Sequence, residues 1–172
     1  KVACIVDNII PHEKRPGDTA FTRYFIKPVD AFVTMSRDVL KDLGTFTAKP
    51  AAFSPHPLYD NYGTAVSREE GCKKLGLEPS VKYILFFGFI RGYKGLDILL
   101  EAMNDARIKD SGIQLIVAGE YYDDRKTYEG IVEKYALHDR VKLFTDFIPE
   151  SEVEYYFAAA VLLVHAYRTA TQ

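Results

Sequence analysis

The sequence contains no tryptophan and only two cysteines, Cys4 and Cys72, among its 172 residues. The two cysteines are far apart and form no CxxC pair, which disfavours a disulfide or metal role, so we interpret both as reduced structural thiols. No apolar run approaches the ~20 residues of a membrane-spanning helix, and no signal peptide is visible. Together these absences predict a cytoplasmic protein.

An excess of charge of one sign is also missing. The chain has 22 Lys and Arg residues and 24 Asp and Glu residues, which gives a net charge of −2. This balance produces no strong field that would attract nucleic acid, and we expect no nucleic-acid partner. The length allows one sizeable domain, or one domain and part of another. Both ends adjoin strand patterns directly, so we expect them to be cuts through a longer protein.

The stretch YILFFGFIRGYKG combines a short apolar run with a loop rich in glycine and basic residues. Tyr83–Phe87 is continuously apolar, which predicts a strand buried on both faces, and Gly88 ends it. Arg91 and Lys94 follow among further glycines. From Leu96 onward, apolar residues recur at i, i+3, i+4 and i+7, which predicts an amphipathic helix.

A strand that passes into a helix through such a turn directs backbone N–H groups and the positive helix end toward one place, which suits an anion. Because Arg91 and Lys94 add two full charges, a diphosphate fits better than a single carboxylate. An ordinary strand–helix turn with solvated basic residues is the alternative. The turn matches neither the Walker loop nor the GxGxxG fingerprint.

From Val81 onward, continuous apolar runs alternate with amphipathic helix patterns. The predicted strands cover residues 83–87, 113–118, 140–144 and 161–164, and capping boxes at Ser67/Glu70 and Ser151/Glu154 predict two helix starts. This alternation indicates an α/β fold, a Rossmann-like parallel sheet with helices on both faces. Ligands of such sheets bind beyond the carboxyl ends of the strands. The residues that follow the strands are therefore site candidates: Gly88, Phe89, Arg91, Lys94, Gly119, Glu120, Asp146, Phe147, Ile148, His165, Tyr167 and Arg168.

The first part of the chain predicts a smaller, partial α/β domain. Strand patterns cover residues 2–6, 31–34 and 51–53, and Ser36 stands at an N-cap position. We expect residues 1–55 to form this domain, residues 56–66 to be a linker rich in Pro, Asp and Asn, and residues 67–172 to form the second domain. His12 lies in the loop IIPHEKRPGD, which is either solvated or the rim of an active site.

The runs FFGFIRGYKGLDILLEAM, LIVAGEYYDD and VKLFTDFIPESEVEYYFAAAVLLVHAYRTATQ follow one another in this order, after DNIIPHEKRPGD and DAFVTMSRDVLKDL. Together they resemble the family-four retaining glycosyltransferases, two-domain enzymes of the GT-B architecture, over nearly the whole chain. The resemblance implies that residues 1–55 end the acceptor-side domain and that residues 67–172 form most of the donor-binding domain. It also implies sugar transfer from a nucleotide-diphosphate sugar to a glycan, lipid or small-molecule acceptor, with retention and without a metal or cofactor.

By this resemblance the diphosphate of the donor binds Arg91 and Lys94, with Gly88 close by, and the nucleobase lies beside Phe147 and Ile148. Arg91 and Lys94 are then also catalytic candidates, because breaking the sugar–phosphate bond leaves negative charge on the departing diphosphate. The loop Thr169–Gln172 is expected to approach the phosphates or the sugar. The other donor-binding candidates are Phe89, Gly119, Glu120, His165, Tyr167, Thr169 and Thr171.

The sequence also departs from the family pattern. Relatives often have His where Asp7 and Asn8 stand, so His12 is our substitute candidate for a catalytic acceptor-side group. The acidic motif that in relatives follows TATQ lies beyond Gln172, so we expect the chain alone to bind weakly and to transfer nothing. Glu120 lies either near the sugar or in a solvated turn.

Two other functions compete with glycosyl transfer. A binding-only module could keep the nucleotide-sugar cleft without turnover. A Rossmann-type oxidoreductase is disfavoured because no GxGxxG follows any strand. Relatives often act at the inner face of a membrane on lipid-linked or polysaccharide acceptors, so peripheral membrane association is an alternative to a purely cytoplasmic location.

Overall fold

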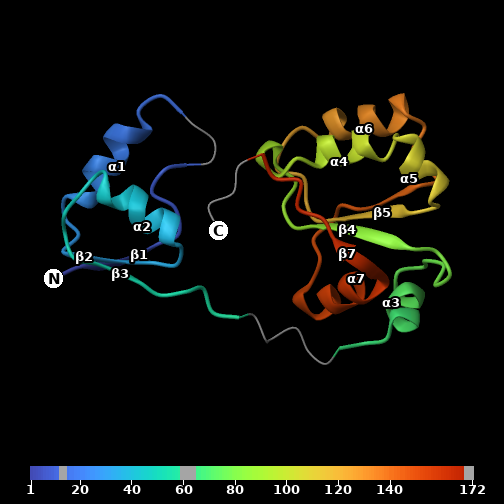
Figure 1. Cartoon of the computed structure of the whole chain (residues 1–172), viewed down its shortest axis with the longest axis horizontal. Coiled ribbons are helices and arrows are strands. Elements are labelled where there is room, and N and C mark those ends of the chain that lie inside the picture. The colour runs from blue at the N-terminus through green and yellow to red at the C-terminus, as the bar shows by residue number, and fades with distance from the viewer. Residues whose placement is uncertain (12–14, 59–64, 169–172) are drawn as a thin grey trace. The chain divides into compact units, whose positions relative to one another are not determined.

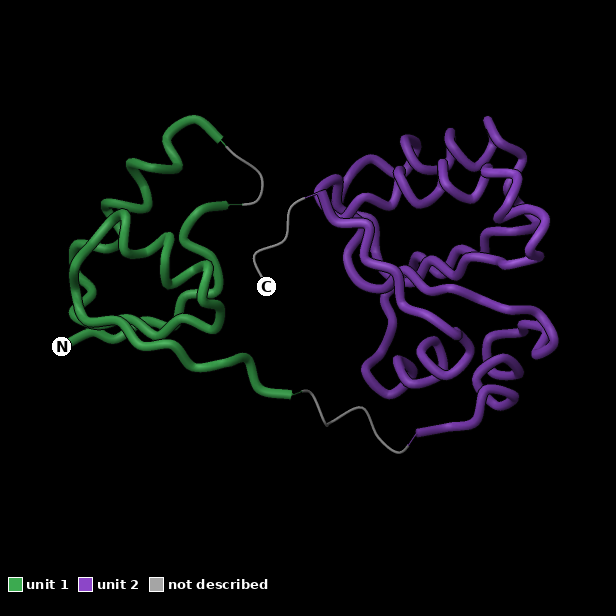
Figure 2. The backbone as a smooth tube through the Cα atoms, in the orientation of Figure 1, with its two compact units in different colours: residues 1–58, 169–172 green, residues 59–168 purple. Residues whose placement is uncertain are grey.

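The computed structural model describes residues 1–11, 15–58 and 65–168 (Figure 1). It divides into two compact units, a first unit within Lys1–Leu58 and a second unit within Tyr59–Arg168 (Figure 2). The expected linker, residues 56–66, overlaps the undescribed residues 59–64 and stays a prediction. His12, Thr169 and Thr171 also lie outside the described residues.

The first unit contains a parallel sheet of order β1-β2-β3, formed by Ala3–Val6, Ala31–Thr34 and Ala51–Phe53. Helices α1 (Asp18–Ile26) and α2 (Arg37–Gly44) lie on the same side of it (Figure 1). The predicted N-cap is confirmed, because the side chain of Ser36 accepts a hydrogen bond from the backbone N–H of Asp38 at 3.2 Å. The core of this unit consists of Val6, Ile9, Ile26, Val29, Phe32, Val39 and Leu43.

The second unit contains a parallel sheet of order β6-β5-β4-β7, with strands Val141–Phe144, Gln114–Ala118, Tyr83–Phe87 and Ala160–Leu163. The predicted parallel α/β sheet is confirmed, although the observed strands differ from the predicted ones by one residue at several ends. Chain order runs from β4 to β5 and β6 on one side and returns to β7 on the other. This reversal of strand order marks the position at which such sheets bind ligands.

Helices cover both faces of this sheet (Figure 1). One face carries α4 (Leu96–Ala102), α5 (Ala106–Asp110) and α6 (Arg125–Lys134), packed on Ile84, Phe86, Leu115 and Val117. The other carries α3 (Arg68–Lys74) and α7 (Val153–Ala159), packed on Tyr83, Leu85, Ile116 and Ala118. Successive strand residues alternate between the two faces and both faces are buried, which explains the continuous apolar runs.

The helix starts test the predicted capping boxes. The side chain of Ser67 accepts a hydrogen bond from the backbone N–H of Glu70 at 3.1 Å, so the cap expected there is present. The box predicted at Ser151 and Glu154 is wrong. Ser151 lies inside a 3₁₀ turn, η2 (Glu150–Glu152), and α7 begins after it without a side-chain cap.

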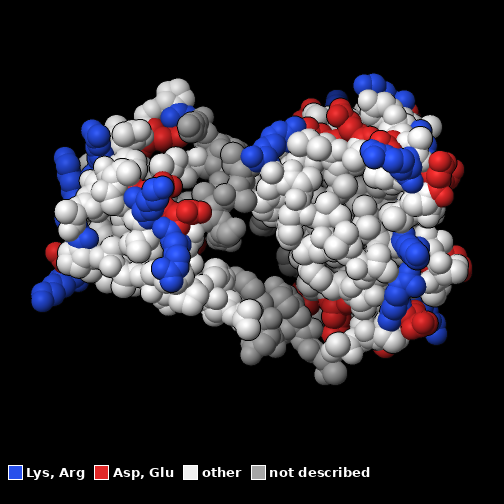
Figure 3. All heavy atoms as spheres, viewed as in Figure 1, with Lys and Arg blue, Asp and Glu red and all other residues white. Residues whose placement is uncertain are grey.

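Within the described ranges, no helix is both long and apolar enough to cross a membrane. Basic and acidic side chains are intermixed on the face shown in Figure 3.

Candidate functional site

The chain segments that leave β4 and β5 run side by side beyond the ends of the two strands. The backbone N–H of Gly88 donates to the carbonyl of Ala118 at 2.9 Å, and that of Ile90 donates to the carbonyl of Glu120 at 2.8 Å. In return, the N–H of Tyr122 donates to the carbonyl of Ile90 at 3.0 Å. The sheet pairing therefore continues past the strands and holds residues 88–91 against residues 119–122.

Two glycines permit this close approach of backbones. A Cβ atom at Gly119 (φ 141°) would collide with the carbonyl of Gly88. A Cβ atom at Gly95 (φ 71°) would collide with the carbonyl of Ala166, which follows β7. Only glycine allows both the positive φ and the contact, so the exits of β4, β5 and β7 come together at these two positions.

Arg91 lies against an aromatic side chain from the β5 exit. Its Cζ atom is 3.8 Å from the centroid of the Tyr122 ring. Phe89 meets the same ring edge to face at a centroid distance of 5.6 Å. Phe89 and Tyr122 are 52% and 64% exposed, so the three side chains form an open surface at the ends of β4 and β5.

Lys94 ends a 3₁₀ turn, η1 (Gly92–Lys94), that leads into α4. Its ammonium lies close to the β4 exit, because a Cβ atom at Gly88 would be 3.0 Å from Lys94 Nζ. It also lies 5.9 Å from the centroid of the Tyr167 ring, which follows β7. Burial, and next the positive charge of Arg91, lower the pKa of Lys94 below its usual value.

We call Arg91 and Lys94 the cation pair. Among residues 1–11, 15–58 and 65–168, neither of them forms an ion pair with a carboxylate. The charge of Arg91 lowers the pKa of Lys94, so the two like charges lie near each other, at the edge of the sheet where the strand order reverses. An anion placed there would relieve their repulsion.

The η1 turn is held by groups from the β5 and β7 exits. The N–H of Gly92 donates to a carboxylate oxygen of Asp123, and its carbonyl accepts from the guanidinium of Arg168 at 3.0 Å. Arg168 also forms a two-point ion pair with Asp97, with contacts of 2.9 and 2.5 Å, and this pair lowers the pKa of Asp97. Asp97 and Asp123 were not predicted from the sequence, because no local pattern indicates that Asp123 binds this turn or that Asp97 pairs with Arg168.

The structure brings most of the predicted site residues to one edge of the sheet. The ring of Tyr167 lies 5.2 Å from that of His165 and 5.9 Å from that of Tyr93. Among the described residues, no hydrogen bond, ion pair or ring contact links Phe147 or Ile148 to the cation pair. Phe147 is 72% exposed beyond β6, and Ile148 packs against the core on the α3–α7 side.

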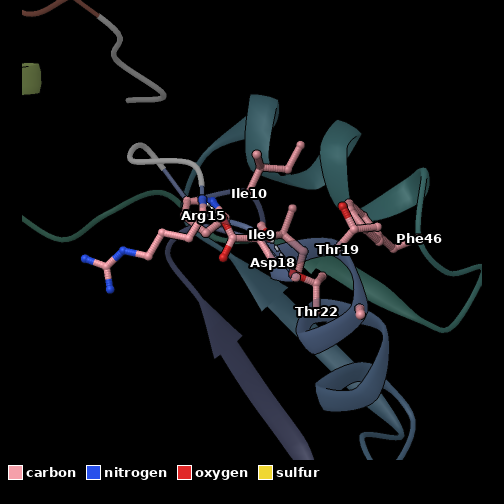
Figure 4. Close-up of a pocket in the computed structure, with 10 residues that line it drawn as sticks. Ile9, Ile10, Arg15, Asp18, Thr19, Thr22 and Phe46 are labelled. Atoms are coloured by element: carbon pink, nitrogen blue, oxygen red, sulfur yellow. Dashed lines mark hydrogen bonds between the residues drawn. The ribbon is translucent and has the colours of Figure 1, made fainter.

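The first unit has a cavity of about 510 Å³ between the β1 exit, the first turns of α1 and Phe46 (Figure 4). Most of its lining is apolar. The guanidinium of Arg15 extends away from the other labelled side chains, and the Thr22 hydroxyl donates to the carbonyl of Ile9 at 3.2 Å. Among the described residues that line this cavity, Arg15 is the only basic one, so they include no counterpart of the cation pair.

Comparison with known proteins connects this geometry to a family. Residues 67–170 match the family described as glycosyl transferases group 1. D-inositol 3-phosphate glycosyltransferase of Segniliparus rotundus is 34% identical over 94 residues, which are 53% of this chain and 21% of that protein.

Solved structures are similar over a longer part of the chain. Sucrose-phosphate synthase from Thermosynechococcus elongatus aligns with a TM-score of 0.77 at 19% identity, over 93% of this chain and 40% of that one. Anabaena Alr3699/HepE in complex with UDP and glucose aligns with a TM-score of 0.78 at 13% identity, over 98% of this chain and 47% of that one. These two likenesses show a shared fold, the GT-B type, of which this chain spans less than half. Because the family match covers more than half of the sequence, including the cation pair and all four strands of the second sheet, the chain belongs to the glycosyl transferases group 1 family.

Proposed function

We propose that this chain is the donor-binding portion of a family-four glycosyltransferase. The enzyme would transfer a sugar from a nucleoside diphosphate sugar to a glycan, lipid-linked or small-molecule acceptor, with retention and without a metal or cofactor. A cytoplasmic location, with or without association with the inner face of a membrane, is part of the proposal. The observation that carries it is the cation pair, which has no carboxylate partner in the described part of the chain.

Electrostatics favours a diphosphate as the ligand of this pair. Two neighbouring cations destabilise each other, and partial burial makes the charged form of Lys94 less favourable still. A ligand with two phosphoryl groups can meet both charges at once, whereas a single carboxylate cannot. When the sugar–phosphate bond breaks, the same cations stabilise the charge that develops on the leaving diphosphate.

The comparisons add a donor class to this argument. The Anabaena protein of similar fold was solved with UDP and glucose, and the Segniliparus relative is named for glycosyl transfer. UDP is therefore the first probe, with GDP and ADP beside it because no contact among the described residues identifies a base. Phe89, Gly119, Glu120, His165 and Tyr167 would surround the diphosphate or sugar, and Phe147 and Ile148 would contact the base. Thr169, Thr171 and the catalytic candidate His12, all outside the described residues, keep their proposed roles.

A calorimetric titration tests the binding step. Arg91→Ala and Lys94→Ala are each expected to weaken the binding of UDP about tenfold or more, which is a loss of about 1.4 kcal/mol or more. Uridine, which has no phosphate, should bind the variants and the parent chain equally. Lys73→Ala on α3 removes an exposed positive charge from the opposite face of the sheet and should change neither affinity. Unchanged UDP affinity in both cation-pair variants would refute the phosphate role.

A binding-only module is the second candidate, because the cation pair would hold a nucleoside diphosphate whether or not a sugar is transferred. Release of UDP from a UDP-sugar by the longer protein that we propose would favour the transferase. The anomeric configuration of the product, read by NMR, would test retention. Binding of UDP without any turnover by that protein would favour the module.

A further inference from the structure

The η1 turn, which carries Lys94 and directly follows Arg91, is held through both backbone polar groups of one residue. The N–H of Gly92 donates to Asp123, from the β5 exit, and the carbonyl of Gly92 accepts from Arg168, from the β7 exit. We propose that Asp123 and Arg168 are positioning residues, which set the distance between the two charges of the cation pair to match a diphosphate. This inference rests on the proposed function.

Arg168 is itself fixed in place by further contacts. Its guanidinium pairs with both carboxylate oxygens of Asp97, at the start of α4, and its backbone N–H donates to the carbonyl of Tyr93 at 2.8 Å. The ion pair keeps Asp97 ionised by lowering its pKa. Two-point pairing of a guanidinium with a carboxylate defines orientation as well as distance. Arg168 therefore meets the turn in one defined geometry.

Asp123 is connected to the core on the other side of the turn. The hydroxyl of Tyr128 donates to the same carboxylate oxygen of Asp123 at 3.3 Å, and Tyr128 is a buried residue of α6. Burial, and then the negative charge of Asp123, raise the pKa of Tyr128 to about 12. The phenol thus remains a hydrogen-bond donor at every pH at which the protein would be assayed.

The turn depends on these polar contacts because side chains do not fill the space beside it. A cavity of about 290 Å³ is lined by Gly92, Asp97, Asp123, Thr127, Tyr128 and Arg168. A closely packed core would fix the turn by volume alone. Here the turn borders an open pocket, and the hydrogen bonds from Asp123 and Arg168 to Gly92 hold it against the repulsion between Arg91 and Lys94.

Two inorganic ligands test the inference without any assumption about the base or sugar. Pyrophosphate can bridge both cations, so its affinity depends on their separation, whereas orthophosphate can be held by either cation. We expect the parent chain to bind pyrophosphate at least about tenfold more tightly than orthophosphate in NMR titrations of residues 88–95. We expect Arg168→Gln and Asp123→Ala to reduce this ratio about fivefold or more. Arg107→Gln, at an exposed arginine of α5, should leave it unchanged.

A double-mutant cycle separates positioning from a general loss of structure. In a Lys94→Ala background the pair no longer exists, so Arg168→Gln should change pyrophosphate affinity less than twofold. Arg168→Lys keeps a cation but not the two-point geometry, so its ratio of pyrophosphate to orthophosphate affinity should lie between those of the parent chain and Arg168→Gln. This variant also keeps the inference testable if Arg168→Gln does not fold. The inference is overturned if Arg168→Lys keeps the full ratio, or if Arg168→Gln weakens both ligands equally or acts equally in both backgrounds. If the parent chain itself shows no preference for pyrophosphate, the proposed function fails as well.

Discussion

The guanidinium of Arg91 lies on the face of the Tyr122 ring, with 3.8 Å between its Cζ atom and the ring centroid. An aromatic face attracts a cation without neutralising it, so the contact orients Arg91 and leaves its full charge available to a ligand. Phe89 also packs against this ring, in an edge-to-face arrangement. Aromatic residues at the β4 and β5 exits thus orient the guanidinium, as a carboxylate could, but they do not compete with a phosphate for its charge.

Replacing Tyr122 tests this interpretation. Tyr122→Phe keeps the ring face and should leave UDP affinity within about twofold of that of the parent chain. Tyr122→Ala removes it and should cost about 0.5–1 kcal/mol of binding free energy, the usual value of an exposed cation–π contact. Tyr24→Ala, at a 75% exposed tyrosine of α1, is the matched control in the same calorimetric titration. Equal losses for Tyr122→Phe and Tyr122→Ala would mean that the hydroxyl group, and not the ring, matters.

The lowered pKa of Lys94 predicts the pH dependence of diphosphate binding. Burial and the charge of Arg91 lower this pKa below 10.5, whereas a bound diphosphate would raise it again. Affinity should therefore be constant near neutral pH and fall as the pH rises through the lowered pKa. In Lys94→Arg the side chain stays protonated over this pH range, so the affinity should not fall. Any change of affinity with pH that remains in this variant comes from titration of the ligand.

The same shift affects folding with a defined sign. Between the lowered pKa and 10.5, the unfolded chain binds the Lys94 proton more tightly than the folded chain does. The contribution of Lys94 to the free energy of unfolding therefore rises with pH across this window. Urea unfolding of the parent chain and of Lys94→Met at several pH values should show the difference, and a contribution that falls with pH would contradict it.

Burial explains which parts of the second unit could be predicted. The strand Tyr83–Phe87 has the predicted bounds, and the four apolar residues predicted to share a helix face from Leu96 to Met103 are all buried. Both patterns follow directly from removing side chains from water. Helix α5 was missed because its five residues are too few for a periodic pattern, and the cap predicted at Ser151 is wrong because η2 displaces the start of α7.

The sequence predicted which segments meet at the site, but not which contacts they make there. Arg91 and Lys94 belong to one strand–helix turn, so local reasoning could bring them together. Asp123 and Arg168 reach this turn from the β5 and β7 exits and bind the backbone of Gly92, whereas Asp97, at the start of α4, pairs with Arg168. No residue type in the sequence indicates which carbonyl a distant arginine will bind.

Gly95 provides a direct test of the close contact between the β4 and β7 exits. Gly95→Ala must adopt φ near 71° and also displace the carbonyl of Ala166. Gly112→Ala has nearly the same φ, 69°, but open space around the added methyl group, so it should cost only about 1–2 kcal/mol of stability. Gly130→Ala, inside α6 and also in open space, should stabilise by about 0.5–1 kcal/mol. In urea unfolding, a loss for Gly95→Ala no larger than that for Gly112→Ala would show that the contact yields freely.

Arg140 connects the helices that follow the cation pair to the sheet. Its guanidinium donates to the carbonyls of Met103, Ile108 and Ile113 at 2.7, 2.8 and 3.0 Å. Arg140→Met keeps most of the side-chain stem and leaves three partly buried carbonyls without their charged donor, so we expect a loss of about 3 kcal/mol of stability. Arg107→Met removes an exposed ion pair and should not shift the urea midpoint measurably. The turn that contains Lys94 directly precedes α4. Arg140→Met should therefore also weaken UDP binding under conditions in which an appreciable fraction of the variant is unfolded. An unchanged midpoint for Arg140→Met would mean that water replaces the guanidinium at all three carbonyls without cost.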